Sequence, residues 1–220
     1  MSDLLPLFPL PSTVLFPNVF LPLHIFEPRY RMMVADAIQG DRLIGMVLLR
    51  PGWERDYEGW PPVYPIGCSG LITHVERLAD GRYNIVLRGI ERFRVLKEDH
   101  GRSYRRATVE PLAERELAAD DRAAIKLQRS KLEELLTANA SRSSFRHAQA
   151  SDSNMPKIPS GMPDEDLVNA LAQYLDLEPL EKQALLELHN LRRRAESLVE
   201  LLEMKLLIAR TPGGVSTVAH

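Results

Sequence analysis

The chain has 220 residues, of which 45% are hydrophobic and 26% charged, and its formal net charge is −2. This is the composition of an ordinary globular protein with one large or two small domains, and it lacks the strong positive charge typical of nucleic-acid binders. A single cysteine, Cys68, excludes an internal disulfide and a cysteine-based metal cage, so we expect a reducing compartment, the cytoplasm. The sequence shows neither a long apolar run nor a signal-peptide pattern, and we therefore expect no membrane partner.

Proline interrupts the apolar stretch at the start of the chain, from Leu4 to Arg31. Because proline lacks a backbone N–H, it is confined to the ends, edges and bulges of strands, so extended pieces here should be short. Glu27-Pro28 is typical of a helix start, since proline suits the first helical position. We expect two extended pieces at 14–16 and 19–21, bent around Pro17-Asn18, and then a helix at 29–39 that ends at Gly40.

The middle of the chain has the two-residue alternation and the short apolar runs that are typical of β-strands. Asp80-Gly81, between two such runs, indicates a hairpin. Gly89 predicts a bulge or a close approach of two backbones. We expect strands at 43–49, 66–78, 83–88, 92–96 and 104–109, with an irregular aromatic loop at 53–65.

From Leu112 onward the apolar period becomes that of amphipathic helices. The apolar band of the last helix is expected to pack in the core or against a second copy of the chain. The charge run 192–194 at the start of that helix is expected to form a solvated face, or alternatively to bridge to acidic residues such as those at 164–166. We expect helices at 112–140, 164–175, 179–189 and 191–210, a flexible connection at 141–163 and a disordered tail at 213–220.

Two blocks of sequence together resemble a known family. LPLFPL, VLFP and LPLHIFEPRYRMMV come first, and YPIGCSGLITHVERLADGRYNIVLRGIERFRV, with its RGxxRFxV pattern, comes second. They resemble the Lon N-terminal (substrate-binding) domain, in the free-standing form that lacks the ATPase and peptidase domains. The resemblance implies the fold class α+β, with a PUA-like β-pseudobarrel at 1–111 followed by a C-terminal α-helical bundle at 112–212.

The resemblance also implies a function. It implies a non-catalytic binding module that recognises unfolded or exposed apolar polypeptide segments, as an adaptor in protein quality control. A protease or chaperone and a second copy of the chain are the further candidate partners. The sequence contains no GxxxxGK[ST] phosphate loop, and we expect neither a cofactor nor enzymatic activity.

The aromatic loop is the candidate polypeptide-binding site. Tryptophan and tyrosine offer large contact areas with few torsions to freeze, which suits the recognition of apolar segments. The alternative is that the rings fold back and cover the barrel. The residues concerned are Trp53, Tyr57, Trp60 and Tyr64.

An arginine-rich stretch supports a second, less favoured hypothesis, RNA binding by a PUA-like fold. Side chains two positions apart on a strand share a face, so Arg92 and Arg94 could both contact phosphates. The alternative is a solvated strand face that discourages edge pairing. The candidate nucleic-acid-binding residues are Arg88, Arg92, Arg94 and Arg105.

The remaining reactive side chains give no strong pattern. Cys68 with His24 or His74 would be a thiolate–imidazole pair, and a hydrolase would use Cys68 or Ser69, but no strand-to-helix elbow surrounds them. We expect Cys68 to be a small buried residue and His24 a packing and hydrogen-bonding residue. The histidines show no metal-ligand spacing, so we expect no metal site.

Overall fold

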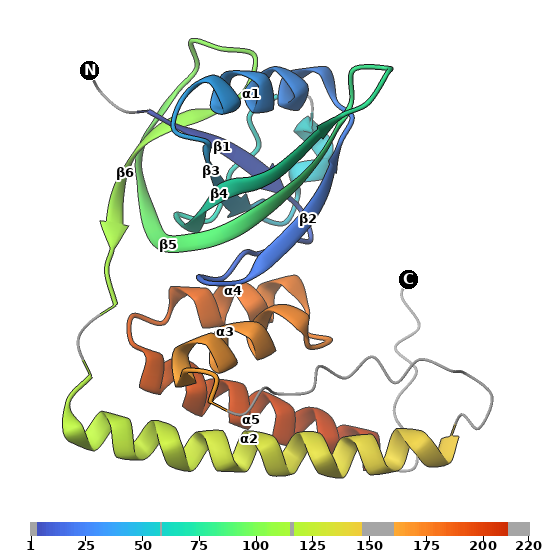
Figure 1. The fold of residues 1–220 in the computed structure, drawn as a ribbon, viewed down its shortest axis with the longest axis vertical. Helices are drawn as coiled ribbons and strands as arrows, with labels where there is room; N and C mark the ends of the chain where they lie inside the picture. The colour runs from blue at the N-terminus through green and yellow to red at the C-terminus, as the bar shows by residue number, and fades with distance from the viewer. Residues whose placement is uncertain (1–3, 58, 115–116, 147–160, 211–220) are drawn as a thin grey trace. The chain divides into compact units, whose positions relative to one another are not determined.

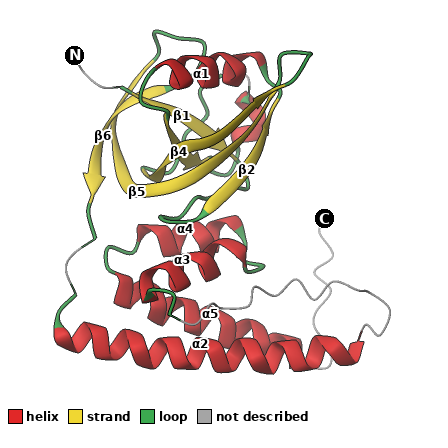
Figure 2. Ribbon diagram, viewed as in Figure 1, coloured by secondary structure: helices red, strands yellow, loops and turns green. Residues whose placement is uncertain are grey.

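The computed structural model describes residues 4–57, 59–114, 117–146 and 161–210, and its elements are drawn in Figures 1 and 2. The strands within these ranges are β1 (Leu5–Leu10), β2 (Phe20–Ile25), β3 (Leu43–Leu48), β4 (Ile66–Arg77), β5 (Tyr83–Asp99) and β6 (Arg106–Leu112). The helices are α1 (Pro28–Gln39), the 3-10 turn η1 (Trp53–Asp56), α2 (Ala119–Arg146), α3 (Asp164–Tyr174), α4 (Pro179–Glu187) and α5 (Leu191–Arg210). The chain is therefore an α+β protein.

The strands form one sheet that closes where β6 pairs with β5. Among the described residues the order is β2-β5-β4-β3-β1-β6, and β5 also pairs with β6. Strands β5, β4, β3, β1 and β6 are thus hydrogen-bonded in a closed ring, to which β2 is added along β5 (Figure 1). All neighbours are antiparallel except β1 and β3. A closed ring leaves few free edges, which protects such a sheet from pairing with other chains.

The long strand β5 makes this closure because it serves two neighbours in succession. Its first half pairs with β2 and its second half with β6, while β4 lies along its other side. The chain passes from one pairing to the next at Gly89, whose N–H donates to Val19 O and whose carbonyl accepts from Asn18 N, each at 2.9 Å. A side chain here would place its Cβ 2.0 Å from Phe16 O. The predicted close backbone approach at Gly89 is confirmed.

The first strand differs from the prediction. The segment LPLFPL, which carries two prolines, forms β1, while residues 14–16 lie outside any strand although all three are buried. β1 tolerates its prolines because each of them has a paired strand on one side only. Pro6 pairs with β6 and precedes the pairing with β3, which begins at Leu7. Pro9 pairs with β3 and lies beyond the pairing with β6. The segment 14–16 is instead hydrogen-bonded by a glutamine side chain from α3, Gln173.

Inside the ring lies an apolar core. Its centre consists of Leu7, Val47, Phe93 and Ala107, each at most 1% exposed. These residues come from four different strands of the ring, so the core forms only when β1, β3, β5 and β6 are assembled. The buried apolar area is the main source of stability of such a fold.

By their contacts within the chain, the residues divide into two compact units, one of 1–114 with 169–189 and one of 115–168 with 190–220. The division differs from the expected domains in that α4 and most of α3 group with the strands. Helix α2 continues to Arg146, so the expected flexible connection does not begin at 141. Residues 147–160 of that connection and the predicted tail lie outside the described residues.

In the second unit, α2 and α5 are joined by ion pairs. Asp121 pairs with Arg192 at 3.2 Å, and ten positions later along α2, Lys131 pairs with Glu203 at 2.7 Å. Both helices therefore run in the same direction. The predicted solvated run at 192–194 is wrong at Arg194, which is 0% exposed. Within the described residues, no helix combines the length and the apolar character needed to cross a membrane.

Candidate functional site

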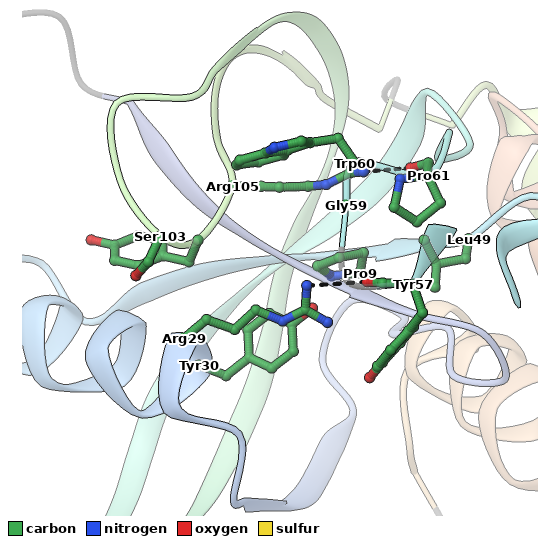
Figure 3. Close-up of a pocket in the computed structure, with 11 residues that line it drawn as sticks. Pro9, Arg29, Tyr30, Leu49, Tyr57, Gly59, Trp60, Pro61, Ser103 and Arg105 are labelled. Atoms are coloured by element: carbon green, nitrogen blue, oxygen red, sulfur yellow. Dashed lines mark hydrogen bonds between the residues drawn. The ribbon is translucent and has the colours of Figure 1, made fainter. Parts of the chain in front are cut away.

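A pocket of about 190 Å³ opens in the strand-containing unit, and we call it the aromatic pocket. It lies where β1, the start of α1, the loop that follows β3 and the turn that precedes β6 meet (Figure 3). The lining side chains used below are Arg29, Tyr30, Tyr57, Trp60, Tyr104 and Arg105. The aromatic loop therefore contributes two of its four predicted residues to the pocket, Tyr57 and Trp60.

The start of α1 and the aromatic loop are joined around Glu27. Arg29 donates from Nε to Glu27 Oε2 at 3.0 Å and from Nη1 to Tyr57 O at 3.2 Å, and the Tyr57 hydroxyl donates to Glu27 Oε1 at 2.5 Å. The guanidinium carbon of Arg29 lies 4.7 Å from the Tyr30 ring centre and 4.9 Å from that of Tyr57. Burial and the bond to Glu27 raise the pKa of Tyr57, so this hydroxyl remains a donor.

Arg105 holds the opposite wall of the pocket. It is 4% exposed, donates from Nη2 to Pro61 O, and lies 3.4 Å from Glu98 in an ion pair. Its guanidinium carbon is 5.3 Å from the Trp60 ring centre, and His100 meets the same ring edge-on at 4.1 Å. Burial lowers the pKa of Arg105, against the opposing effect of Glu98. Trp60 thus stays 38% exposed while two cationic or polar groups fix its ring.

Two tyrosines in the pocket differ in how their hydroxyl groups are used. Tyr104 donates to Asp36 Oδ2 at 2.7 Å, and burial together with this bond raises the pKa of Tyr104 to about 12. Tyr30 is 4% exposed, and its ring lies 4.5 Å from that of Phe8. Within the part of the chain that the structure describes, the Tyr30 hydroxyl makes no hydrogen bond. Burial raises the pKa of Tyr30, so that hydroxyl carries a proton at neutral pH.

The other two residues of the predicted polypeptide site lie beside the pocket and do not line it. Trp53 is half-buried and packs edge-on against Tyr57, with ring centres 5.4 Å apart. Tyr64 is half-buried under the guanidinium group of Arg50, at 5.4 Å. The four rings of the loop therefore differ in position: Tyr57 and Trp60 line the pocket, whereas Trp53 and Tyr64 pack against neighbouring residues.

Two of the four candidate RNA-binding arginines are buried and held by the chain itself. Arg92 is 2% exposed and donates from Nη1 to Leu186 O at 3.1 Å and Leu188 O at 2.6 Å, with an ion pair to Glu114 at 3.3 Å. Arg105 is the residue beneath Trp60. A buried guanidinium group that already has partners is a poor phosphate ligand.

Arg88 and Arg94 are exposed. Arg94 pairs with Glu110 at 3.1 Å, and Arg88 lies 3.5 Å from Asn18 Oδ1. Arg92 and Arg94, which the RNA hypothesis placed on one face of a strand, differ in exposure, because that face of β5 is covered at Arg92 and open at Arg94. A spacing of two residues shows that two side chains share a face of a strand. It does not show which of them the rest of the fold covers and which stays exposed.

Sequence reasoning did not assign Arg29 and Tyr30 to a site, although both stand in the quoted EPRYR motif. They follow Glu27-Pro28 in the first turn of α1. Because the helix begins at Pro28, its geometry fixes the directions in which the side chains of Arg29 and Tyr30 leave the backbone. No spacing in the sequence connects this turn to Trp60 or to Arg105. Their proximity depends on the ring of strands.

Cys68 and His24 each have hydrogen-bonding neighbours within the described residues. Cys68 is 0% exposed within β4, with Sγ 3.5 Å from Ser69 O, as a small buried residue would be. His24 is exposed, hydrogen-bonds Asn84 at 2.7 Å and stacks against the Phe26 ring with ring centres 6.4 Å apart, so it makes both a hydrogen bond and a packing contact, at the surface. The described residues contain no group of three or more candidate metal ligands.

Comparison with known proteins places the chain in a family. The family model of the ATP-dependent protease La (LON) substrate-binding domain matches residues 4–204. The Lon protease of Anaeromyxobacter dehalogenans (strain 2CP-C) is 26% identical over 91% of this chain and 23% of its own length. Lon protease 2 of Myxococcus xanthus is also 26% identical, over 92% of this chain and 24% of its own length. The chain thus spans about a quarter of the length of these relatives.

Solved structures show the same fold. The N-terminal domain of Mycobacterium avium complex Lon protease matches with a TM-score of 0.64 and 17% identity, over 91% of this chain and 98% of that one. The Lon N-terminal domain protein from Xanthomonas campestris matches with a TM-score of 0.54 and 22% identity, over 96% and 99% of the two chains. Because the family model covers most of the sequence and these folds agree, the chain belongs to the Lon substrate-binding domain family.

Proposed function

We propose that this protein is a non-catalytic module that binds unfolded or exposed apolar segments of other polypeptides through the aromatic pocket. The observation that carries the proposal is the position of Trp60, an indole ring left 38% exposed at a pocket and held in place by Arg105 and His100. A fixed, accessible ring loses little conformational entropy when it binds, and this favours recognition. An adaptor role in protein quality control, with a protease or chaperone as partner, extends the same proposal.

Membership in a substrate-binding domain family supports this reading. The closed ring of strands fits a PUA-like pseudobarrel, which we propose as the scaffold of the site. Burial of apolar surface contributes about 25 cal/mol per Å² before ordering costs are subtracted. A pocket of about 190 Å³ buries little surface. We therefore expect weak binding of any single segment and low sequence selectivity.

The direct test is a fluorescence-anisotropy titration of the full chain into two labelled probes, a permanently unfolded polypeptide and a single-stranded RNA, at low and high salt. We expect saturable binding of the polypeptide that persists at high salt, because apolar contacts are not screened. RNA binding that collapses with salt would instead favour the exposed arginines Arg88 and Arg94, since counterion release makes phosphate binding salt-dependent.

Two variants localise the site. Trp60→Ala removes the exposed ring and should weaken polypeptide binding by about tenfold, the scale of one well-placed aromatic contact. Ile90→Ala is the matched control, because Ile90 is 40% exposed and does not line the aromatic pocket. Equal dissociation constants for Trp60→Ala and the unmodified protein would remove the pocket from the polypeptide-binding site.

A further inference from the structure

The size of the aromatic pocket limits what it can hold. Pockets for small organic ligands commonly enclose about 300–1,000 Å³, whereas a cavity of about 150 Å³ is filled by benzene. At about 190 Å³, the aromatic pocket is suited to one ring-sized or branched apolar side chain. A polypeptide would therefore place a single residue in it, and the groups around that residue decide which kind is accepted.

The polar group best placed to select a ligand is the Tyr30 hydroxyl. Tyr30 lines the pocket, and only 4% of the residue is exposed. Among the described residues, its hydroxyl makes no hydrogen bond. This hydroxyl is not among the fully buried, unpartnered atoms of the described residues, so it reaches the open space of the pocket, where a ligand acceptor can receive its hydrogen bond. The phenol keeps its proton, since burial raises the pKa of Tyr30, so the group offers a donor and calls for an acceptor.

The charge beside this hydroxyl indicates which acceptor fits. The Arg29 guanidinium carbon lies 4.7 Å from the centre of the Tyr30 ring, and Figure 3 shows the two side chains together on one side of the pocket. Two nearby carboxylates are already engaged, because Glu27 accepts from Tyr57 and Arg29, and Glu98 pairs with Arg105. Arg29 is itself paired with Glu27 at 3.0 Å, so what it offers a ligand carboxylate, beside the phenol donor, is its remaining guanidinium N–H groups.

We propose that the aromatic pocket receives a carboxylate together with the apolar side chain next to it, with Tyr30 and Arg29 as the groups that bind the carboxylate. This proposal rests on the proposed function, because it specifies which class of polypeptide segment the same pocket binds. A polypeptide has two sources of that chemistry: the α-carboxylate of a chain end whose last residue is apolar, and an aspartate or glutamate side chain beside an internal apolar residue.

The test uses three labelled peptides of one sequence with the full chain. The first ends in phenylalanine with a free carboxylate, the second has the same end as an amide, and the third is the amide with an aspartate before the phenylalanine. We expect the free acid to bind at least about tenfold more tightly than the amide, the scale of one hydrogen bond to a charged group. If the third peptide also binds tightly, the pocket accepts both the α-carboxylate of a chain end and an acidic side chain. If only the first peptide binds tightly, the pocket accepts the chain end alone.

Two tyrosine variants separate the proposed role from a packing role. Tyr30→Phe removes one oxygen and keeps the ring against Phe8, and it should lower the acid-to-amide ratio by about fivefold, with the remaining preference due to Arg29. Tyr104→Phe is the matched control, because Tyr104 lines the same pocket but its hydroxyl is bonded to Asp36. It should leave that ratio unchanged.

The outcomes are distinct. Equal binding of all three peptides would overturn the carboxylate inference and leave the polypeptide-binding function standing. A ratio that is high in the unmodified protein and unaltered by Tyr30→Phe would also overturn it, since the hydroxyl would then have no part in the selection. If none of the peptides and no unfolded polypeptide binds, the proposed function itself is wrong.

Discussion

The side-chain oxygen of Gln173 accepts a hydrogen bond from the backbone N–H of Phe16 at 3.2 Å, across 157 positions of sequence. The amide nitrogen of the same side chain donates to Val14 O at 2.9 Å. One glutamine from α3 therefore gives the segment 14–16 the two bonds that a neighbouring strand would otherwise supply. A buried segment that lies outside the sheet thus has partners for two of its backbone groups.

Replacing Gln173 should destabilise the fold. Gln173→Ala leaves the buried N–H of Phe16 and carbonyl of Val14 without partners, and each such group costs about 1–3 kcal/mol. We expect the free energy of unfolding of the strand-containing unit to fall by about 2–4 kcal/mol, measured by urea denaturation. Gln39→Ala, at an exposed position of α1, is the control and should change it by less than about 0.5 kcal/mol. A fall no larger than that of the control would mean that the two bonds contribute nothing.

The two arginines of β5 should differ sharply in their effect on stability. Arg92→Leu removes a buried cation that holds two carbonyl groups and Glu114, and losing one member of such a network costs about 3–5 kcal/mol. Arg94→Leu breaks only a surface pair with Glu110, in which both side chains are about half exposed, and should cost at most about 1 kcal/mol. Thermal unfolding of both variants measures the difference, and equal shifts would contradict the structural role of Arg92.

A methyl group at Gly89 should not be tolerated. Its Cβ would lie 2.0 Å from Phe16 O, a backbone atom that cannot move without breaking the bonds of residues 18 and 19 to Gly89. We expect Gly89→Ala to lower the free energy of unfolding by more than about 2 kcal/mol, as steric overlap in a packed region does. Gly40→Ala is the matched control, because its nearest atoms would lie at 3.8 Å. Circular dichroism during thermal unfolding compares the two variants.

Much of the fold could be predicted because its signals are local. The helix after Glu27-Pro28, the strand of residues 43–48 and the hairpin at Asp80-Gly81 each depend on residues a few positions apart. The segment 14–16 could not be predicted, since its hydrogen bonds come from Gln173, and neither could the continuity of β5 through Gly89. Alternation predicts a strand equally well whether its partners are other strands or a side chain.

The candidate site was predictable only in part, for a related reason. Composition indicates that Tyr57 and Trp60 belong to a surface loop, and both line the aromatic pocket. The burial of Arg92 and Arg194, at 2% and 0% exposure, runs against the usual position of arginine and depends on groups distant in sequence. Their charge therefore suggested that both arginines lie on a solvated surface, whereas the fold buries both guanidinium groups.

Tyr104 should make the fold sensitive to alkaline pH. Burial and the bond to Asp36 raise the pKa of Tyr104 from its ordinary value of 10 to about 12 in the folded protein. Because the folded state favours the protonated phenol, this contribution to stability is fully present below pH 10 and is lost as the pH rises towards about 12. Tyr104→Phe cannot titrate, so its free energy of unfolding should fall less between these pH values than that of the unmodified protein. Ultraviolet absorbance of tyrosinate follows the titration itself, and urea denaturation at each pH follows stability. Parallel stability curves for the two proteins would show that the phenol of Tyr104 is not held in its protonated form by the fold.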